Sequence, residues 1–170
     1  MKDNFEQCFA LVIKHEGGYV DNPKDPGGAT NLGCTKAVWE EWVGHPVTKE
    51  DIKALTINDV IPLYRKKYWD AVKGDDLPEG VDYAVFDFAI NSGPGKAART
   101  LQKVLGVAQD GQIGPATLRA LEATNPRDIA TSICEARLEF LQGLPTYGTF
   151  GKGWSRRVSE VESTAFSMVG

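Results

Sequence analysis

The sequence lacks the features of a membrane-spanning or nucleic-acid-binding chain. No apolar run approaches the roughly 20 residues that a helix needs to cross a bilayer. The first residues, MKDNFEQCF, alternate charged and apolar side chains, so we expect no signal peptide for the general secretion route. The net charge is −4, whereas nucleic-acid binding normally requires a basic face. We therefore expect neither stable membrane insertion nor binding to nucleic acid.

Cysteine and histidine are also scarce. The three cysteines, Cys8, Cys34 and Cys134, are far apart and form no CxxC motif. Their odd number and wide spacing favour neither a disulfide framework nor a zinc site. The two histidines, His15 and His45, do not form a cluster with other metal-ligating residues in the sequence. We expect reduced thiols at synthesis, no bound metal and no cofactor.

What the sequence does contain is helical periodicity. With 170 residues, 42% of them hydrophobic, the chain can bury the core of one domain. An amphipathic helix is predicted from Phe5 to Glu16, and threonines typical of helix caps occur at positions 35, 48 and 56. Further helices are predicted at residues 56–72, 81–91, 96–105, 115–123, 126–142 and 152–168.

Two of these segments have unusual features. Pro62 should either kink the segment 56–72 or mark the true start of its helix. The segment 81–91 is apolar on nearly every side, which is typical of a central helix surrounded by others.

Strand signals are weak. The segment 19–34 is nevertheless too long for a simple connection between helices, and it could hold a short hairpin. The sequence therefore predicts a mainly α fold.

Glycine, proline and acidic residues concentrate in HEGGYVDNPKDPGGATNLG, residues 15–33. Glu16 lies on the apolar face and in the last turn of its predicted helix, where burial and the helix dipole both disfavour the ionised carboxylate. A raised pKa suits a general acid. Asp21 and Asp25 are candidates for a second carboxylate, and Asp25 is preferred because nine residues let the chain turn back across a cleft. Alternatively, Glu16 is a solvated helix end and both aspartates are turn residues.

Three residues outside this loop are candidate substrate contacts. Asp87 lies within the apolar segment 81–91, so it must have a partner or face a cavity. Asn91 precedes a glycine-containing turn and could offer an amide donor to the acetamido group of a sugar. Trp69 could stack on a sugar ring, although tryptophans at helical spacing usually belong to the core.

Motifs along the whole chain resemble those of one enzyme family. They are Glu16-Gly17-Gly18-Tyr19-Val20, Asn22-Pro23, Asp25-Pro26-Gly27-Gly28, Thr30, Gly33, Tyr68-Trp69, Phe86-Asp87, Asn91-Ser92-Gly93, Asp110-Gly111, Ile113-Gly114-Pro115, Thr117, Gly153-Trp154 and Arg156-Arg157. This set resembles the signature of glycoside hydrolase family 108, the peptidoglycan N-acetylmuramidases of phage endolysins and bacterial secretion accessories. The resemblance implies a lysozyme-like helical fold with a small loop or β-hairpin region after the first helix.

The same resemblance implies a reaction and roles for three residues. Glu16 corresponds to the catalytic acid, and Asp25 and Thr30 resemble the residues that position the hydrolytic water in phage-type lysozymes. The interval from Asp25 to Thr30 is one residue shorter than in that arrangement. The expected reaction is hydrolysis of the β-1,4 bond between N-acetylmuramic acid and N-acetylglucosamine, with inversion. The alternatives are a lytic transglycosylase that forms anhydro-muramic products, and a non-catalytic peptidoglycan-binding protein.

The expected organisation is a single domain, 1–170, with a catalytic part at 1–91 and a helical lobe at 92–170. Within the lobe, DGQIGPATLRAL resembles a loop of small peptidoglycan-binding modules, although plain turn chemistry also explains it. The expected partner is the peptidoglycan glycan strand, and the expected state is a monomer. We expect a phage endolysin made in the bacterial cytoplasm, which reaches periplasmic peptidoglycan through a holin. The alternative is a secretion-linked muramidase released by another route.

Overall fold

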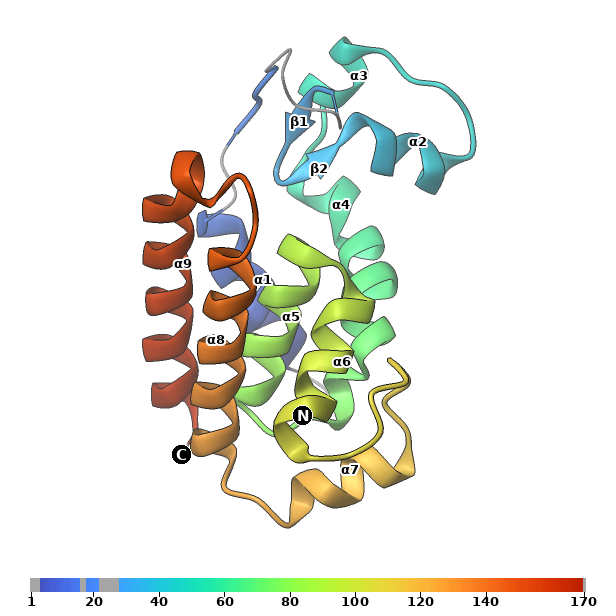
Figure 1. Ribbon diagram of the computed structural model, residues 1–170. Helices are drawn as coiled ribbons and strands as arrows, with labels where there is room; N and C mark the ends of the chain where they lie inside the picture. Colours follow the sequence, from blue (N-terminus) through green and yellow to red (C-terminus); the bar gives the residue numbers. More distant parts are fainter. Residues whose placement is uncertain (1–3, 16–17, 22–27, 170) are drawn as a thin grey trace. The chain divides into compact units, whose positions relative to one another are not determined.

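The computed structural model describes residues 4–15, 18–21 and 28–169 (Figure 1). Helices dominate it, and one small antiparallel sheet follows the first helix, α1 (Asn4–His15). The predicted mainly α fold with a hairpin after the first helix is therefore confirmed. The chain forms two compact units, which we call the hairpin unit (Phe9–Lys66) and the helical unit (Met1–Cys8 with Lys67–Gly170).

The sheet of the hairpin unit consists of two short strands joined by a tight turn. β1 (Thr30–Asn31) pairs with β2 (Cys34–Thr35), so that Thr30 lies opposite Thr35. The two turn residues, Leu32 and Gly33, both have positive φ angles, of 54° and 76°. Positive φ at both central residues is typical of the turn whose twist matches that of the flanking strands. The turn therefore keeps the register of a sheet too short to fix it alone.

Three helices of the hairpin unit begin at the threonines that the sequence identified as caps. Thr35 caps α2 (Lys36–Val43) by accepting a hydrogen bond from the amide of Val38, at 3.1 Å. Capping boxes begin α3 (Lys49–Lys53) and α4 (Ile57–Tyr64), where Thr48 and Thr56 exchange hydrogen bonds with an aspartate three residues later. The predicted helix starts at these positions are confirmed.

The chain does not stay α-helical after α4. The helix begins ahead of Pro62, so the alternative that Pro62 marks its start is wrong. The backbone then forms a π-helical turn, η1 (Arg65–Trp69), and two 3₁₀ turns, η2 (Asp70–Val72) and η3 (Gly74–Asp76). Pro62 lies in the α4 helix itself, and the regular α-helix ends two residues after it, at Tyr64.

In the helical unit, α5 (Val81–Ser92) is the central element. Every residue from Val81 to Ala89 is buried. α5 contacts α6 (Pro94–Leu105), α8 (Pro126–Gln142) and α9 (Tyr147–Met168), while α7 (Pro115–Glu122) packs on α6 (Figure 1). α8 and α9 lie side by side. The expectation of a central helix enclosed by others is confirmed.

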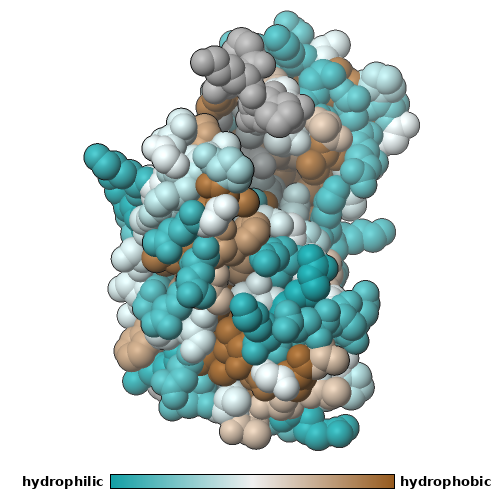
Figure 2. Space-filling view, in the orientation of Figure 1, coloured by the Kyte–Doolittle hydropathy of each residue, from teal (hydrophilic) through white to brown (hydrophobic). Residues whose placement is uncertain are grey.

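The surface is mixed in character. The face seen in Figure 2 is largely hydrophilic, with apolar residues distributed between polar ones. The large apolar side chains that are exposed are Val20, Trp42, Ile57, Phe150 and Phe166. Within the described ranges, no helix combines the length and hydropathy that crossing a membrane requires.

Candidate active site

Two of the three predicted catalytic residues, Glu16 and Asp25, lie outside the described residues. The structure describes the framework on both sides of them. Glu16 directly follows α1, which ends at His15. Val20 and Thr30 exchange two backbone hydrogen bonds of 2.7 Å each. This pair therefore holds together the two ends of the segment whose sequence contains Asp25.

The third predicted catalytic residue, Thr30, is held in place by its neighbour in β1. Asn31 is buried, and its side-chain amide donates to the carbonyls of Ile52 at 3.0 Å and Lys53 at 3.1 Å, with a longer contact of 3.4 Å to Leu55. The last turn of a helix leaves carbonyls without intrahelical donors. Asn31 donates to carbonyls at the end of α3, of which that of Ile52 also accepts the amide of Leu55 at 3.2 Å, and thereby anchors the strand that carries Thr30.

We expect Asn31→Ala to lower the free energy of unfolding by about 1–3 kcal/mol, because it removes a buried side chain that donates to the carbonyls at the end of α3. Urea denaturation followed by circular dichroism measures this loss. Asn58→Ala is the matched control, since Asn58 is exposed on α4. Equal denaturation midpoints for the two variants would show that Asn31 does not anchor β1.

The turn of the hairpin has a second anchor. Tyr64, at the end of α4, donates its hydroxyl to the carbonyl of Leu32 at 2.7 Å. Its ring packs against Phe9 of α1, with ring centroids 5.5 Å apart. This bond fixes the position of a non-glycine residue in the left-handed region, a conformation that normally costs about 1 kcal/mol or more.

Asp21, the less favoured candidate for the second carboxylate, lies on the exposed surface in an ion pair. Its carboxylate accepts a hydrogen bond from Lys49 at 2.9 Å. That hydrogen bond, together with the negative charge of Asp21, raises the pKa of Lys49. Such an exposed pair contributes little to stability.

The three predicted substrate contacts lie in different environments. Asn91 is exposed in the last turn of α5, ahead of Gly93 with φ 95°. Its role as a substrate contact stays a prediction. Trp69 is fully buried, and its indole N–H donates to Asp75 at 2.9 Å. Its ring packs edge-on against Phe5 and Phe86, with centroids 5.5 and 5.2 Å away. This burial gives Trp69 a role in the core and disfavours it as a stacking platform for sugar.

Asp87 is fully buried and has the partners that its position in an apolar helix requires. Arg137 donates to one carboxylate oxygen at 2.6 Å. Arg157 donates to both oxygens, at 2.9 and 3.2 Å. Burial alone would raise the pKa of Asp87, but the two guanidinium groups outweigh it and hold the pKa below its usual range. The network stabilises the contact of α5 with α8 and α9 and disfavours Asp87 as a substrate contact.

Arg137 is the residue that sequence reasoning missed. It lies 50 residues after Asp87 in the chain and is 1% exposed. The available signal was its position one turn after Ile133 on the buried face of the helix predicted at 126–142. A buried arginine on an apolar face requires an anion, just as a buried aspartate requires a cation.

The segment around Asp110 is organised by a buried glutamine of α6. The amide of Gln102 donates to Asp110 at 2.8 Å, to the carbonyl of Gln112 at 3.0 Å and to Thr117 at 3.2 Å. Its oxygen accepts the amide of Gly111 at 2.9 Å. These bonds fix the turn that leads into α7, so the polar groups of the DGQ motif are engaged within the protein.

The described residues hold no cluster of three or more metal-ligating side chains. The predicted catalytic residues carry two carboxyl groups and one hydroxyl, groups that general acid–base catalysis uses. The geometry that the structure describes is that of a strand and turn, anchored by Asn31 and Tyr64, which follow the acidic glycine-rich segment in the sequence.

Two family models and a solved structure match this chain. Residues 9–93 match the family model for glycosyl hydrolase 108, and residues 96–159 match that of a predicted peptidoglycan domain. The solved structure of Brucella abortus SagA is 51% identical and superposes with a TM-score of 0.94, covering 99% of this chain and 97% of that one. None of the curated proteins matches significantly.

These matches confirm the lysozyme-like helical fold and the prediction of an enzyme that is a glycoside hydrolase. The peptidoglycan domain identifies cell-wall peptidoglycan as the material on which the enzyme acts. Because the family model matches its first half and SagA is 51% identical over nearly its whole length, the chain belongs to the glycosyl hydrolase 108 family.

Proposed function

We propose that this enzyme is an N-acetylmuramidase, which hydrolyses the β-1,4 bond between N-acetylmuramic acid and N-acetylglucosamine. The observation that carries the proposal is the arrangement of the two family matches in one chain. The hydrolase match at 9–93 contains Glu16, Asp25 and Thr30, and the peptidoglycan match follows it at 96–159. A hydrolase segment combined with a peptidoglycan segment fits a glycosidase whose substrate is the glycan strand.

In the proposed mechanism, Glu16 protonates the oxygen of the leaving sugar. Asp25 accepts a proton from a water molecule, and Thr30 orients that water toward the anomeric carbon. An acid and a base that act on opposite faces of the sugar invert the anomeric configuration. The hydrogen-bonded pair Val20–Thr30 supports this proposal, because it joins the two ends of the segment whose sequence contains Asp25 at the strand that contains Thr30.

The proposed biological setting is a phage endolysin that accumulates as a monomer in the bacterial cytoplasm. A holin would then give it access to periplasmic peptidoglycan, and a secretion-associated muramidase is the alternative setting. Expression in a Gram-negative host with and without a holin tests this. Lysis that requires the holin supports the endolysin setting, and survival of the cells in both cases contradicts it.

The products released from purified peptidoglycan test the reaction itself. Soluble fragments are analysed by mass spectrometry before and after borohydride reduction. Fragments that end in a reducible N-acetylmuramic acid establish a muramidase. Anhydro-muramic ends would make the enzyme a lytic transglycosylase, and sedimentation with unlysed walls without soluble product would make it a binding protein.

A further inference from the structure

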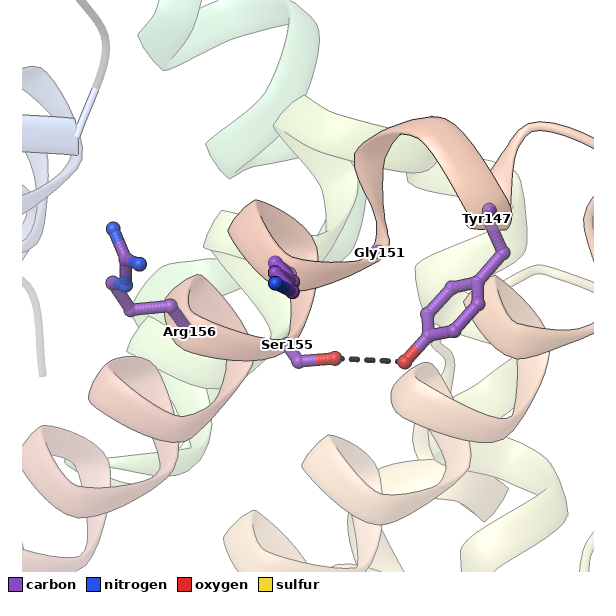
Figure 3. A pocket seen from close by; sticks show the side chains of 6 residues that line it. Tyr147, Gly151, Ser155 and Arg156 are labelled. Carbon is purple, nitrogen blue, oxygen red and sulfur yellow. Dashed lines mark hydrogen bonds between the residues drawn. The ribbon is translucent and has the colours of Figure 1, made fainter.

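A hollow of about 460 Å³ lies along the first turns of α9, and we call it the α9 groove (Figure 3). Its volume is in the range of small-ligand sites. It is lined by Tyr147, Gly148, Gly151, Lys152, Ser155 and Arg156. In Figure 3 the ring of Tyr147 lies at one end, and the side chain of Arg156 extends at the other.

The groove follows from the spacing of glycines in the helix. Residues four apart form rows on a helix surface, and two adjacent rows here are 147–151–155 and 148–152–156. Gly151 lets the ring of Tyr147 lie over the helix, because a Cβ at this position would be 2.8 Å from the ring. The hydroxyl of Tyr147 then pairs with Ser155 at 3.0 Å (Figure 3). Gly148 adds no side chain to the second row.

The groove is cationic in an acidic protein. Lys152 and Arg156 are both exposed, and the residues that line the groove include no acid. Neither cation forms an ion pair with another residue of the described ranges. The chain as a whole has a net charge of −4, so the groove reverses the overall sign locally. Two cations side by side without a counter-charge are suited to bind an anion.

An aromatic pair occupies another row of α9, 150–154, outside the lining of the groove. Phe150 is 52% exposed and stacks on Trp154, with ring centroids 5.7 Å apart and planes 28° apart. Trp154 also lies 6.3 Å from the ring of Tyr147. An exposed aromatic surface offers contact area to methyl and methylene groups of a ligand. Within the groove the ring of Tyr147 provides such contact area, so the ligand that fits the groove combines carboxylates with short apolar segments.

A second hollow on α9 has the same volume, about 460 Å³, but the opposite chemistry. Its lining includes the acid Glu162, the ring of Phe166 and several hydroxyls, and no lysine or arginine. Positive charge is therefore not common to the two hollows along this helix. The cations of the α9 groove are a local feature of its sequence.

We propose that the α9 groove binds the acidic stem peptide of peptidoglycan. The inference rests on the proposed function, which makes peptidoglycan the substrate. The glycan strand is uncharged where the lactyl groups of its muramic acids are amide-linked to peptides, so the negative charges of the polymer lie on the stem-peptide carboxylates. Lys152 and Arg156 bind these carboxylates, and the ring of Tyr147 contacts the methyl and methylene groups of the peptide.

Titration of the ¹⁵N-labelled protein with a synthetic stem peptide, L-Ala-γ-D-Glu-diaminopimelate, tests the proposal by NMR. We expect amide shifts at Gly148, Gly151 and Gly153, and much weaker binding of the same peptide with its carboxylates converted to carboxamides. The double variant Lys152→Gln/Arg156→Gln should bind the acidic peptide about tenfold more weakly, because it loses two charge-assisted contacts.

The control variant Lys103→Gln/Arg119→Gln removes two exposed cations from α6 and α7 and has the same net charge. It should bind the acidic peptide like the wild type. Equal binding of acid and amide peptides, or equal weakening in both double variants, would overturn the proposal. Peptidoglycan cleavage by the wild type is measured in parallel. Cleavage without peptide binding would contradict peptide binding in the α9 groove and leave the proposed function intact. Peptide binding without cleavage would contradict the proposed function and leave peptide binding in the groove intact.

Discussion

Asp87→Asn is expected to lower the free energy of unfolding by about 3–5 kcal/mol, because it removes the shared anion from two buried or half-buried arginines. Arg137, which is almost wholly buried, would be left without a counter-charge. In a chain of this size the loss corresponds to a fall in melting temperature on the order of 10 °C. Thermal and urea unfolding followed by circular dichroism measure it. Glu135→Gln, an exposed acid on α8 with the same charge change, is the control.

The stabilisation that Asp87 provides is expected to depend on pH. The pKa of Asp87 is held below its usual range, so its carboxylate stabilises the fold above the unfolded pKa of about 3.9. That stabilisation is lost as the pH falls through the lower folded pKa. Asp82 acts in the opposite sense, because burial raises its pKa and protonation then favours the folded state. The difference between wild type and Asp87→Asn isolates Asp87 and should shrink below about pH 4. A difference independent of pH would show that the ion pairs do not stabilise the fold.

Glu16→Gln is expected to reduce hydrolysis of purified peptidoglycan by a factor of about 10²–10⁴, because the amide has the size of the carboxylic acid but cannot donate the proton that the leaving oxygen needs. Release of reducing ends measures the rate. Glu6→Gln is the matched control, since Glu6 is an exposed acid on α1. Retention of most of the activity by Glu16→Gln, at an unchanged melting temperature, would remove Glu16 from the mechanism.

Asp25→Asn distinguishes the two glycan-cleaving mechanisms. A hydrolase needs a base for its water, so the variant should lose most activity. A transglycosylase forms its anhydro ring without that water and would retain full activity in the variant. Asp25 is supported as the base that activates water only if the variant cleaves more slowly and the products of the wild type have reducing ends.

Local sequence signals predicted the local structure well. Thr48 with Asp51, and Thr56 with Asp59, are three residues apart, and both pairs form capping boxes. The helix predicted at 126–142 has these bounds in the structure. The last helix was predicted from residue 152, but it begins at Tyr147. Its first turns contain three glycines, which are unfavourable inside a helix, and the ring of Tyr147 packs over one of them, Gly151.

Those local signals could not identify the residues that contact each side chain in the folded protein. The sequence required a partner for Asp87 but could not choose Arg137 and Arg157, which are 50 and 70 residues away. Trp69 could not be assigned to core or surface, because its burial depends on Phe5 and Phe86 from two other helices. For the site itself, the sequence identified Thr30, but the anchoring of its strand by Asn31 depends on carbonyls of residues more than 20 positions later.

All three thiols are buried, so their reaction with alkylating reagents can report local opening of the structure. Cys8, Cys34 and Cys134 are at most 2% exposed. Burial also raises the pKa of Cys8, and it raises that of Cys134 to about 12, so both stay protonated at neutral pH. A protonated, enclosed thiol reacts with alkylating reagents only when the surrounding structure opens. The alkylation rate of each cysteine, separated by peptide mapping, therefore measures how often the hairpin unit, through Cys34, and the helical unit, through Cys8 and Cys134, open independently in the native enzyme.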